Sequence, residues 1–135
     1  MRPADTERAA SLETVGMTRR RRLPNRRPAL TETIGFATGD GRVTHYKATV
    51  GFDELGRPKE IFLFGAKDGT DMASVLADTA VALSVALQHG VSAESMALSI
   101  ARVSLADGSS RAGMPASVIG AALDLLARYE QGSSE

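Results

Sequence analysis

The chain has 135 residues and carries sixteen Lys and Arg against sixteen Asp and Glu, so it has no net charge at pH 7. This length supports one domain with a modest core, which Ala, Val, Leu and Ile must supply because tryptophan is absent and aromatic residues are few. The lack of cysteine excludes disulfides, thiolate metal sites and thiol redox chemistry within the chain. His45 and His89 have no second ligand at a metal-binding spacing, so neither a metal nor another cofactor is expected.

The positive charge is concentrated near the N-terminus, where residues 1–30 hold eight arginines and three acids. Prolines and like-charge repulsion predict a disordered basic arm over residues 1–28, before a folded domain over 29–130 and a frayed tail over 131–135. Six of its arginines could bind nucleic-acid phosphates or an acidic protein surface, and a solvated arm is the alternative. These are Arg19, Arg20, Arg21, Arg22, Arg26 and Arg27. No aromatic residue lies between them to stack on bases.

Three segments after the arm have the pattern of β-strands. Polar and apolar residues alternate over 31–38, residues 43–52 are rich in Val, Thr and Tyr, and residues 60–64 are again mostly apolar. Residues 39–41 supply glycines of positive φ for a hairpin turn, and Pro58 lies at a strand entry, where it costs no hydrogen bond. Short turns between sequential strands predict an antiparallel meander.

The second half of the chain has helical periodicity. The Thr-Asp pair at 70–71 can cap a helix with apolar residues at spacings of three and four, which ends at Gly90. Ser92 caps a second helix that runs through Ala101, and Pro115 fits the first turn of a third helix. The predicted fold is therefore α+β, a three-stranded antiparallel meander followed by three helices packed on one face (βββααα).

No segment has the character of a signal peptide or a membrane span. Acidic residues precede any apolar block at the N-terminus, and the most apolar stretch, 75–87, is interrupted by Asp78 and indicates a buried helix. A cytoplasmic protein without membrane contact is expected. The small residues of its helices favour an apolar face shared in a homo-oligomer.

The loop before the first helix is the candidate ligand site. Glycine amides, a lysine and a helix N-terminus favour an anion such as a nucleotide phosphate, but the Gly-Lys-Ser/Thr ending of a P-loop is missing and a simple strand-to-helix turn is the alternative. Its acids could also bind a cation or act as acid and base, although acids commonly serve such a position as helix caps. The candidate residues are Gly65, Lys67, Asp68, Gly69, Thr70 and Asp71. No nucleophile elbow is present, and no catalytic residue is nominated.

Several segments together resemble one known family. The motifs Gly-Arg-Pro…Glu-Ile-Phe at 56–62 and Leu-Gln-His-Gly-Val at 87–91 carry most of the resemblance, supported by residues 23–27, 49–52 and 69–72. Over about residues 23–129 the chain resembles the TSCPD domain, which occurs at the C-terminus of adenosylcobalamin-dependent (class II) ribonucleotide reductases and as free-standing proteins. The resemblance implies a link with deoxyribonucleotide synthesis and a ribonucleotide reductase as a partner.

The chain departs from that family at one position. The family takes its name from a Thr-Ser-Cys-Pro-Asp run, and the matching residues here are 112–116, with Met114 in place of cysteine and Pro115 retained. Any role of that cysteine is not carried over, and the barrel and active-site cysteines of a reductase are missing. We therefore expect a non-catalytic accessory or regulatory protein related to the reductase C-terminus. Nucleic-acid binding by the basic arm and nucleotide binding by the loop at 65–71 are the alternatives.

Overall fold

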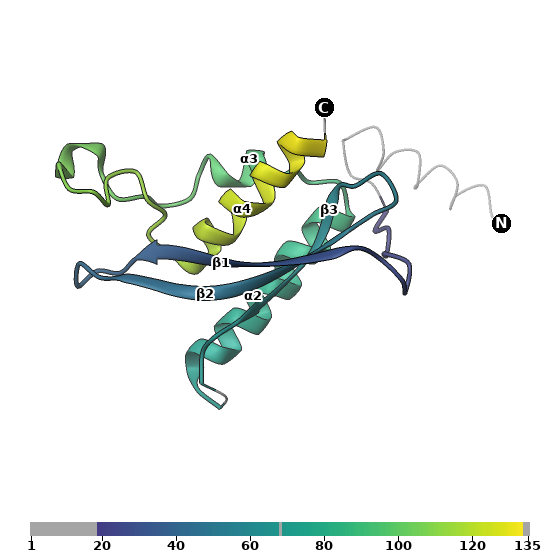
Figure 1. The fold of residues 1–135 in the computed structure, drawn as a ribbon, viewed down its shortest axis with the longest axis horizontal. Helices are drawn as coiled ribbons and strands as arrows, with labels where there is room; N and C mark the ends of the chain where they lie inside the picture. Colours follow the sequence, from purple (N-terminus) through teal and green to yellow (C-terminus); the bar gives the residue numbers. More distant parts are fainter. Residues whose placement is uncertain (1–18, 68, 134–135) are drawn as a thin grey trace, which may run out of the picture.

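The computed structural model describes residues 19–67 and 69–133, which form one sheet followed by helices (Figure 1). The strands are β1 (Ala29–Ala37), β2 (Val43–Phe52) and β3 (Pro58–Phe64). The helices are α2 (Asp71–Gln88), α3 (Ala93–Ala97) and α4 (Val118–Ser133), with a short 3₁₀ helix, η1 (Leu105–Asp107), between the last two. The predicted α+β class and βββααα order are confirmed, and Pro58 is the first residue of its strand, as expected.

The sheet is an antiparallel meander in the order β1-β2-β3. Because successive side chains of a strand point to opposite faces, one face carries the buried residues. These are Ile34, Phe36, Ala48, Val50, Ile61 and Leu63. Phe62 and Phe64 alternate with them on β3 and are 45% and 53% exposed. In the β1–β2 turn Gly41 has a φ of 86°, whereas Gly39 does not adopt the predicted positive φ.

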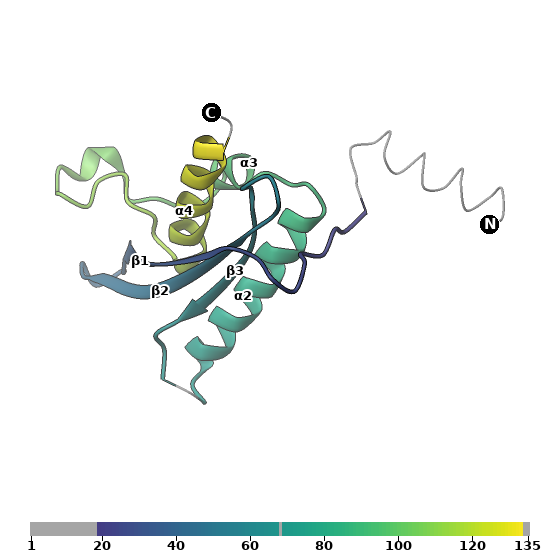
Figure 2. The ribbon, with the colours of Figure 1, turned by 45° about the vertical axis from the view of Figure 1, so that its right-hand side comes forward.

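Helix α2 lies along β3 and covers that edge of the sheet (Figure 2). Thr70 caps the helix as predicted, since its hydroxyl accepts a hydrogen bond from the Ala73 N–H at 3.2 Å. On the inner side, the Ser84 hydroxyl accepts from the Ile61 N–H at 2.9 Å and donates to the Ile61 carbonyl at 3.2 Å. These two bonds occupy backbone groups that an edge strand would otherwise leave unpaired.

By length and composition alone, α2 would also be able to cross a membrane, a test that core helices of soluble proteins pass as well. Its inner residues Leu76, Leu83 and Leu87 are at most 7% exposed, and they belong to the same core as the buried residues of β3. Asp78 lies on the exposed side of the helix. The packing on β3 therefore accounts for the apolar residues on the inner side of α2.

Two predicted helix boundaries are wrong. The second helix ends at Ala97 instead of Ala101; beyond it Leu98 is 84% exposed, whereas Ile100 is partly buried against the core. Pro115 does not start the third helix, which begins at Val118. Pro115 instead forms an isolated antiparallel bridge with Arg102, and its carbonyl accepts the Ala37 N–H at the end of β1 at 2.9 Å. Tertiary hydrogen bonds thus override the local helix signal.

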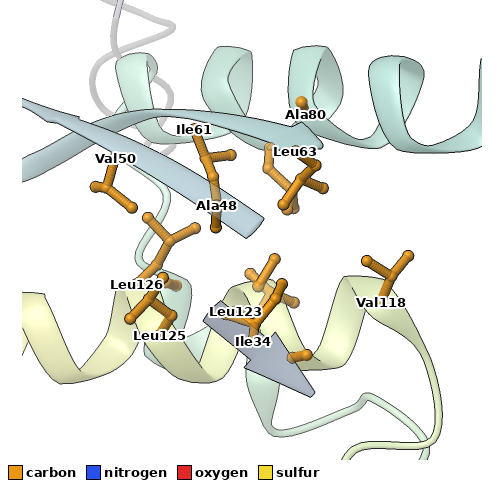
Figure 3. Packing of buried hydrophobic residues seen from close by; sticks show 14 of the residues in the cluster. Ile34, Ala48, Val50, Ile61, Leu63, Ala80, Val118, Leu123, Leu125 and Leu126 are labelled. Carbon is orange, nitrogen blue, oxygen red and sulfur yellow. The ribbon is translucent and has the colours of Figure 1, made fainter. Parts of the chain in front are cut away.

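Helix α4 completes the core on the buried face of the sheet. Figure 3 shows Leu123 and Leu126 of α4 on one side and Val50 and Ile61 of the sheet on the other, with the side chains meeting between them. All four are at most 1% exposed. Such burial is the main stabilising term for a domain of this size.

Helix α4 also fixes α3. Its Glu130 carboxylate accepts the N–H groups of Ala93 and Glu94 at 2.7 and 3.0 Å. These are first-turn donors of α3, which have no partner within the helix itself. A carboxylate from one helix therefore caps the N-terminus of another.

The surroundings of the Tyr129 hydroxyl make the free energy of unfolding depend on pH in the alkaline range. Its hydroxyl donates to the Glu32 carboxylate at 2.7 Å, and burial, followed by this bond and the negative charge of Glu32, raises the pKa of Tyr129 to about 12. Because the folded-state pKa lies above the ordinary 10.0, the contribution of Tyr129 is fully present below pH 10 and is lost as pH rises towards 12. We expect Tyr129→Phe to flatten the fall of the unfolding free energy across this window.

Urea denaturation at a series of pH values measures this effect. Tyr46→Phe, which removes the other tyrosine hydroxyl of the chain, is the matched control. Equal slopes for the wild type and Tyr129→Phe between pH 10 and 12 would contradict the assignment.

Candidate functional site

The described part of the basic arm, residues 19–28, lies against the domain without helix or strand structure (Figure 2). Gln88 at the end of α2 holds it at one point: its side-chain oxygen accepts from Arg20 Nε at 2.7 Å, and its backbone carbonyl accepts from the Arg21 N–H at 2.8 Å. Further along, Arg27 forms two bonds to the Glu60 carboxylate, at 2.7 and 2.8 Å. The arm therefore follows a defined path from α2 past β3 to β1. Residues 1–18 lie outside the described part, and the predicted boundary at 29 stays a prediction.

These contacts divide the six candidate arginines into two groups. The Arg27 side chain is 25% exposed and Glu60 15% exposed, and a paired, partly buried guanidinium of this kind serves to hold the arm. Arg20 is exposed but bonded to Gln88. The side chains of the other four are exposed: Arg19, Arg21, Arg22 and Arg26.

The turn between β2 and β3 is organised by Asp53. One of its carboxylate oxygens accepts the N–H groups of Leu55 and Arg57, both at 2.9 Å, and the other accepts from Arg57 Nε at 2.8 Å. Burial would raise the pKa of Asp53, but the bonds from Arg57 and Leu55 outweigh it and hold that pKa below its ordinary value. Since only Nε of Arg57 is used in the bond to Asp53, its two terminal NH₂ groups still have hydrogen-bond donors to offer.

Lys59 lies between this turn and the end of α2. Its ammonium group donates to the Leu87 carbonyl at 3.1 Å, where the helix C-terminus carries partial negative charge. Burial is the main cause that lowers the pKa of Lys59, and the positive charge of Arg57 adds to it, while Asp53 acts in the opposite direction. The ammonium thus has a partly desolvated position among other charges.

The arm, the turn and the end of α2 together enclose a surface hollow of about 520 Å³, within the size range of small-molecule sites. We call it the cationic hollow. Its charged lining residues are Arg21, Arg22, Arg57, Lys59, Asp53 and Glu54, and its other lining residues are Leu23, Pro24, Leu55, Gln88 and Gly90. Positive groups outnumber the carboxylates, and Asp53 is already paired with Arg57.

Sequence reasoning nominated Arg21 and Arg22 of this hollow but missed Asp53, Arg57, Lys59 and Gln88. A signal was present, because these last three residues lie in the segments 56–62 and 87–91 that carry the family resemblance. The structure brings the two segments together beside the arm.

The predicted loop site lies elsewhere, between β3 and α2. Gly65 and Gly69 have φ angles of 127° and 80°, so they are needed for the path of the chain from strand to helix. The Thr70 hydroxyl donates to the Lys67 carbonyl at 2.6 Å and also accepts from Ala73, so it is used in capping. Asp71 is exposed in the first helical turn, and Asp68 lies outside the described residues. These contacts fit the strand-to-helix alternative, and nucleotide binding by the loop stays a prediction.

Within residues 19–67 and 69–133, no group of three or more potential ligand side chains is placed to hold a metal ion. His45 is exposed on β2, and Met114 is partly buried next to Pro115. The backbone of Met114 is used in the loop, where its carbonyl accepts the Val103 N–H at 2.9 Å.

Comparison with known proteins places the chain in a family. The sequence profile of the TSCPD domain matches residues 17–129. A vitamin B12-dependent ribonucleotide reductase from Rhodopirellula baltica is 36% identical over 94 residues, which cover 67% of this chain and 9% of that reductase. The chain thus spans less than a tenth of the relative's length. No solved structure matches it. Because the profile covers most of the sequence, the chain belongs to the TSCPD domain family.

Proposed function

We propose that this chain is a non-catalytic accessory or regulatory protein of deoxyribonucleotide synthesis, which acts by binding a ribonucleotide reductase. The observation that carries the proposal is its similarity to one small part of a vitamin B12-dependent ribonucleotide reductase. The chain has no cysteine, so it has no thiol with which to reduce a ribonucleotide. It would act through the surfaces that it presents.

One surface suited to a protein partner lies beside β3 and α2. Phe62, Phe64 and Val81 are 45%, 53% and 62% exposed, and they line one groove together with Ala77. Large apolar side chains that gather on an exposed surface are typical of protein interfaces. We name these four residues the apolar groove.

The experiment mixes the purified chain with the ribonucleotide reductase of the same organism and measures complex formation by calorimetry and turnover by product analysis. We expect binding of the wild type, weaker binding of a Phe62→Ser, Phe64→Ser variant, and no change for Leu98→Ser, which alters an exposed apolar residue just after α3. No binding and no change in turnover would remove the reductase link.

We also propose that the chain forms a homo-oligomer through the apolar groove. Two copies that cover their apolar grooves would remove Phe62, Phe64 and Val81 from water. Light scattering coupled to size exclusion should then give a dimer or larger species for the wild type and a smaller mass for the Phe62→Ser, Phe64→Ser variant. A monomer at all concentrations would exclude it.

A second candidate function is nucleic-acid binding, favoured by the four exposed arginines Arg19, Arg21, Arg22 and Arg26. Phosphate contacts of this kind weaken steeply with salt and do not depend on base sequence. Replacing these four residues with Ser should abolish a salt-dependent gel shift of DNA or RNA. An unchanged shift, or none for the wild type, would refute this function.

A further inference from the structure

We propose that the cationic hollow binds a small molecule that carries a di- or triphosphate group. Its cationic side chains come from two segments that are far apart in the sequence: the arm supplies Arg21 and Arg22, and the junction of the β2–β3 turn with β3 supplies Arg57 and Lys59. A hollow lined from two segments can offer a compact anion contacts from more than one side, whereas a flat basic patch cannot. The inference rests on the hollow alone and is independent of the reductase partnership.

The fold holds two of these cations in place before any ligand arrives. Arg57 is fixed by Asp53 at 2.8 Å, and Lys59 by the Leu87 carbonyl at 3.1 Å. Each bond uses one donor and leaves others for a phosphate oxygen. Donors that are already ordered lose little conformational entropy on binding, which favours affinity.

The electrostatics of the hollow favour a polyanion over a single carboxylate. Setting Asp53 and Glu54 against the four cations leaves an excess of two positive charges. Lys59 lies within the influence of two cations, Arg57 and Arg21, and of two carboxylates, Asp53 and Glu130, which act in the opposite direction. An anion between the cations would relieve their repulsion, and hydrogen bonds from Arg and Lys to phosphate are among the stronger ones in proteins.

The arm closes one side of the hollow and gives it an apolar wall. Leu23 and Pro24 line this wall, and Leu55, which is 71% exposed, lies on the turn opposite. Apolar side chains beside a phosphate site can contact the planar or aliphatic part of a ligand. Because Arg20, Arg21 and Arg27 all bond the arm to the domain, this wall is part of the folded structure.

Calorimetric titration of the full chain at low salt tests the proposal with four probes: pyrophosphate, ATP, adenosine and a short single-stranded oligonucleotide. We expect ATP and pyrophosphate to bind and adenosine not to bind. Tighter binding of ATP than pyrophosphate would show that the apolar wall contributes, and equal binding would show that phosphate alone is recognised. Binding of the oligonucleotide alone, or of adenosine as tightly as ATP, would overturn the proposal in favour of another ligand class.

Two variants connect the binding to the hollow. Lys59→Gln should weaken the binding of ATP about tenfold, as expected for the loss of one charge-assisted hydrogen bond. Arg21→Gln with Arg22→Gln removes the charges of two exposed side chains, so it keeps the test valid if Lys59→Gln does not fold. Arg42→Gln is the matched control, because that side chain is 83% exposed on the β1–β2 turn. No binding of either phosphate at millimolar concentration, or equal affinity in all four proteins, would overturn the proposal.

Discussion

Leu126→Ala is expected to destabilise the domain by about 2–5 kcal/mol, the range for deleting a buried leucine side chain. Leu126 is 0% exposed and lies among the core residues of α4 and the sheet (Figure 3). Removing its side chain forfeits both the transfer free energy of the lost atoms and the contacts around the resulting cavity. Since small domains are stable by only about 5–15 kcal/mol, a large part of the native stability would be lost.

Urea denaturation followed by circular dichroism measures this loss as a lower midpoint at constant slope. Leu98→Ala is the control, because it deletes the same atoms from a side chain that is 84% exposed, and its effect should be within about 0.5 kcal/mol. Similar midpoints for the two variants would show that α4 does not pack on the sheet as described.

Ser84→Ala is expected to cost about 1–3 kcal/mol, which is large for the loss of one oxygen atom. The Ser84 side chain is the partner of both the N–H and the C=O of Ile61, and Ser84 is only 9% exposed. Without it, two backbone groups of β3 lose their hydrogen bonds at a site that water does not reach easily. The Ser84 hydroxyl thus contributes to stability because it is the hydrogen-bond partner of two backbone groups of β3.

Ser74→Ala on the same helix is the matched control. Ser74 is exposed, and alanine favours helices slightly more than serine does, so its effect should be close to zero or slightly stabilising. Equal midpoints for Ser84→Ala and Ser74→Ala in urea would contradict the role of Ser84. A second readout is aggregation on heating, which should rise in Ser84→Ala because an unsatisfied strand edge can pair with another chain.

The sheet and α2 could be predicted from sequence because their signals are local. Alternation of polar and apolar residues marks the first strand, Val, Thr and Tyr mark the second, and an apolar run marks the third. Thr70 and the apolar period after it mark the start of α2. The segment after Ala97 was harder, since its conformation depends on distant partners. Arg102 donates two hydrogen bonds to the Asp124 carboxylate, one of them at 2.8 Å. The Pro115 carbonyl accepts a hydrogen bond from Ala37 at the end of β1. No local pattern records such contacts.

The candidate site shows the same limit. The arginines of the arm are visible as a charge run, but Lys59 and Gln88 are separated by 29 residues and have no shared pattern. They meet because α2 runs back along β3, so that the Gln88 amide donates to the Lys59 carbonyl at 3.1 Å. The family resemblance marked both segments, whereas only the fold shows that they form one wall.

The two edge strands of the sheet, β1 and β3, differ in how many of their backbone groups remain available to pair with an added strand. At β3, Ser84 and Gln88 already occupy outward-facing backbone groups of Ile61 and Lys59, so another strand could enter there only by displacing α2. At β1, Pro115 occupies the end of the strand at Ala37. Along an antiparallel strand, successive residues direct their N–H and C=O groups to opposite sides. The middle of β1 therefore also directs backbone groups away from β2, and the hydrogen bond between Ala37 and Pro115 does not involve them. Any extension of this sheet by an added strand would therefore be one-sided, at β1.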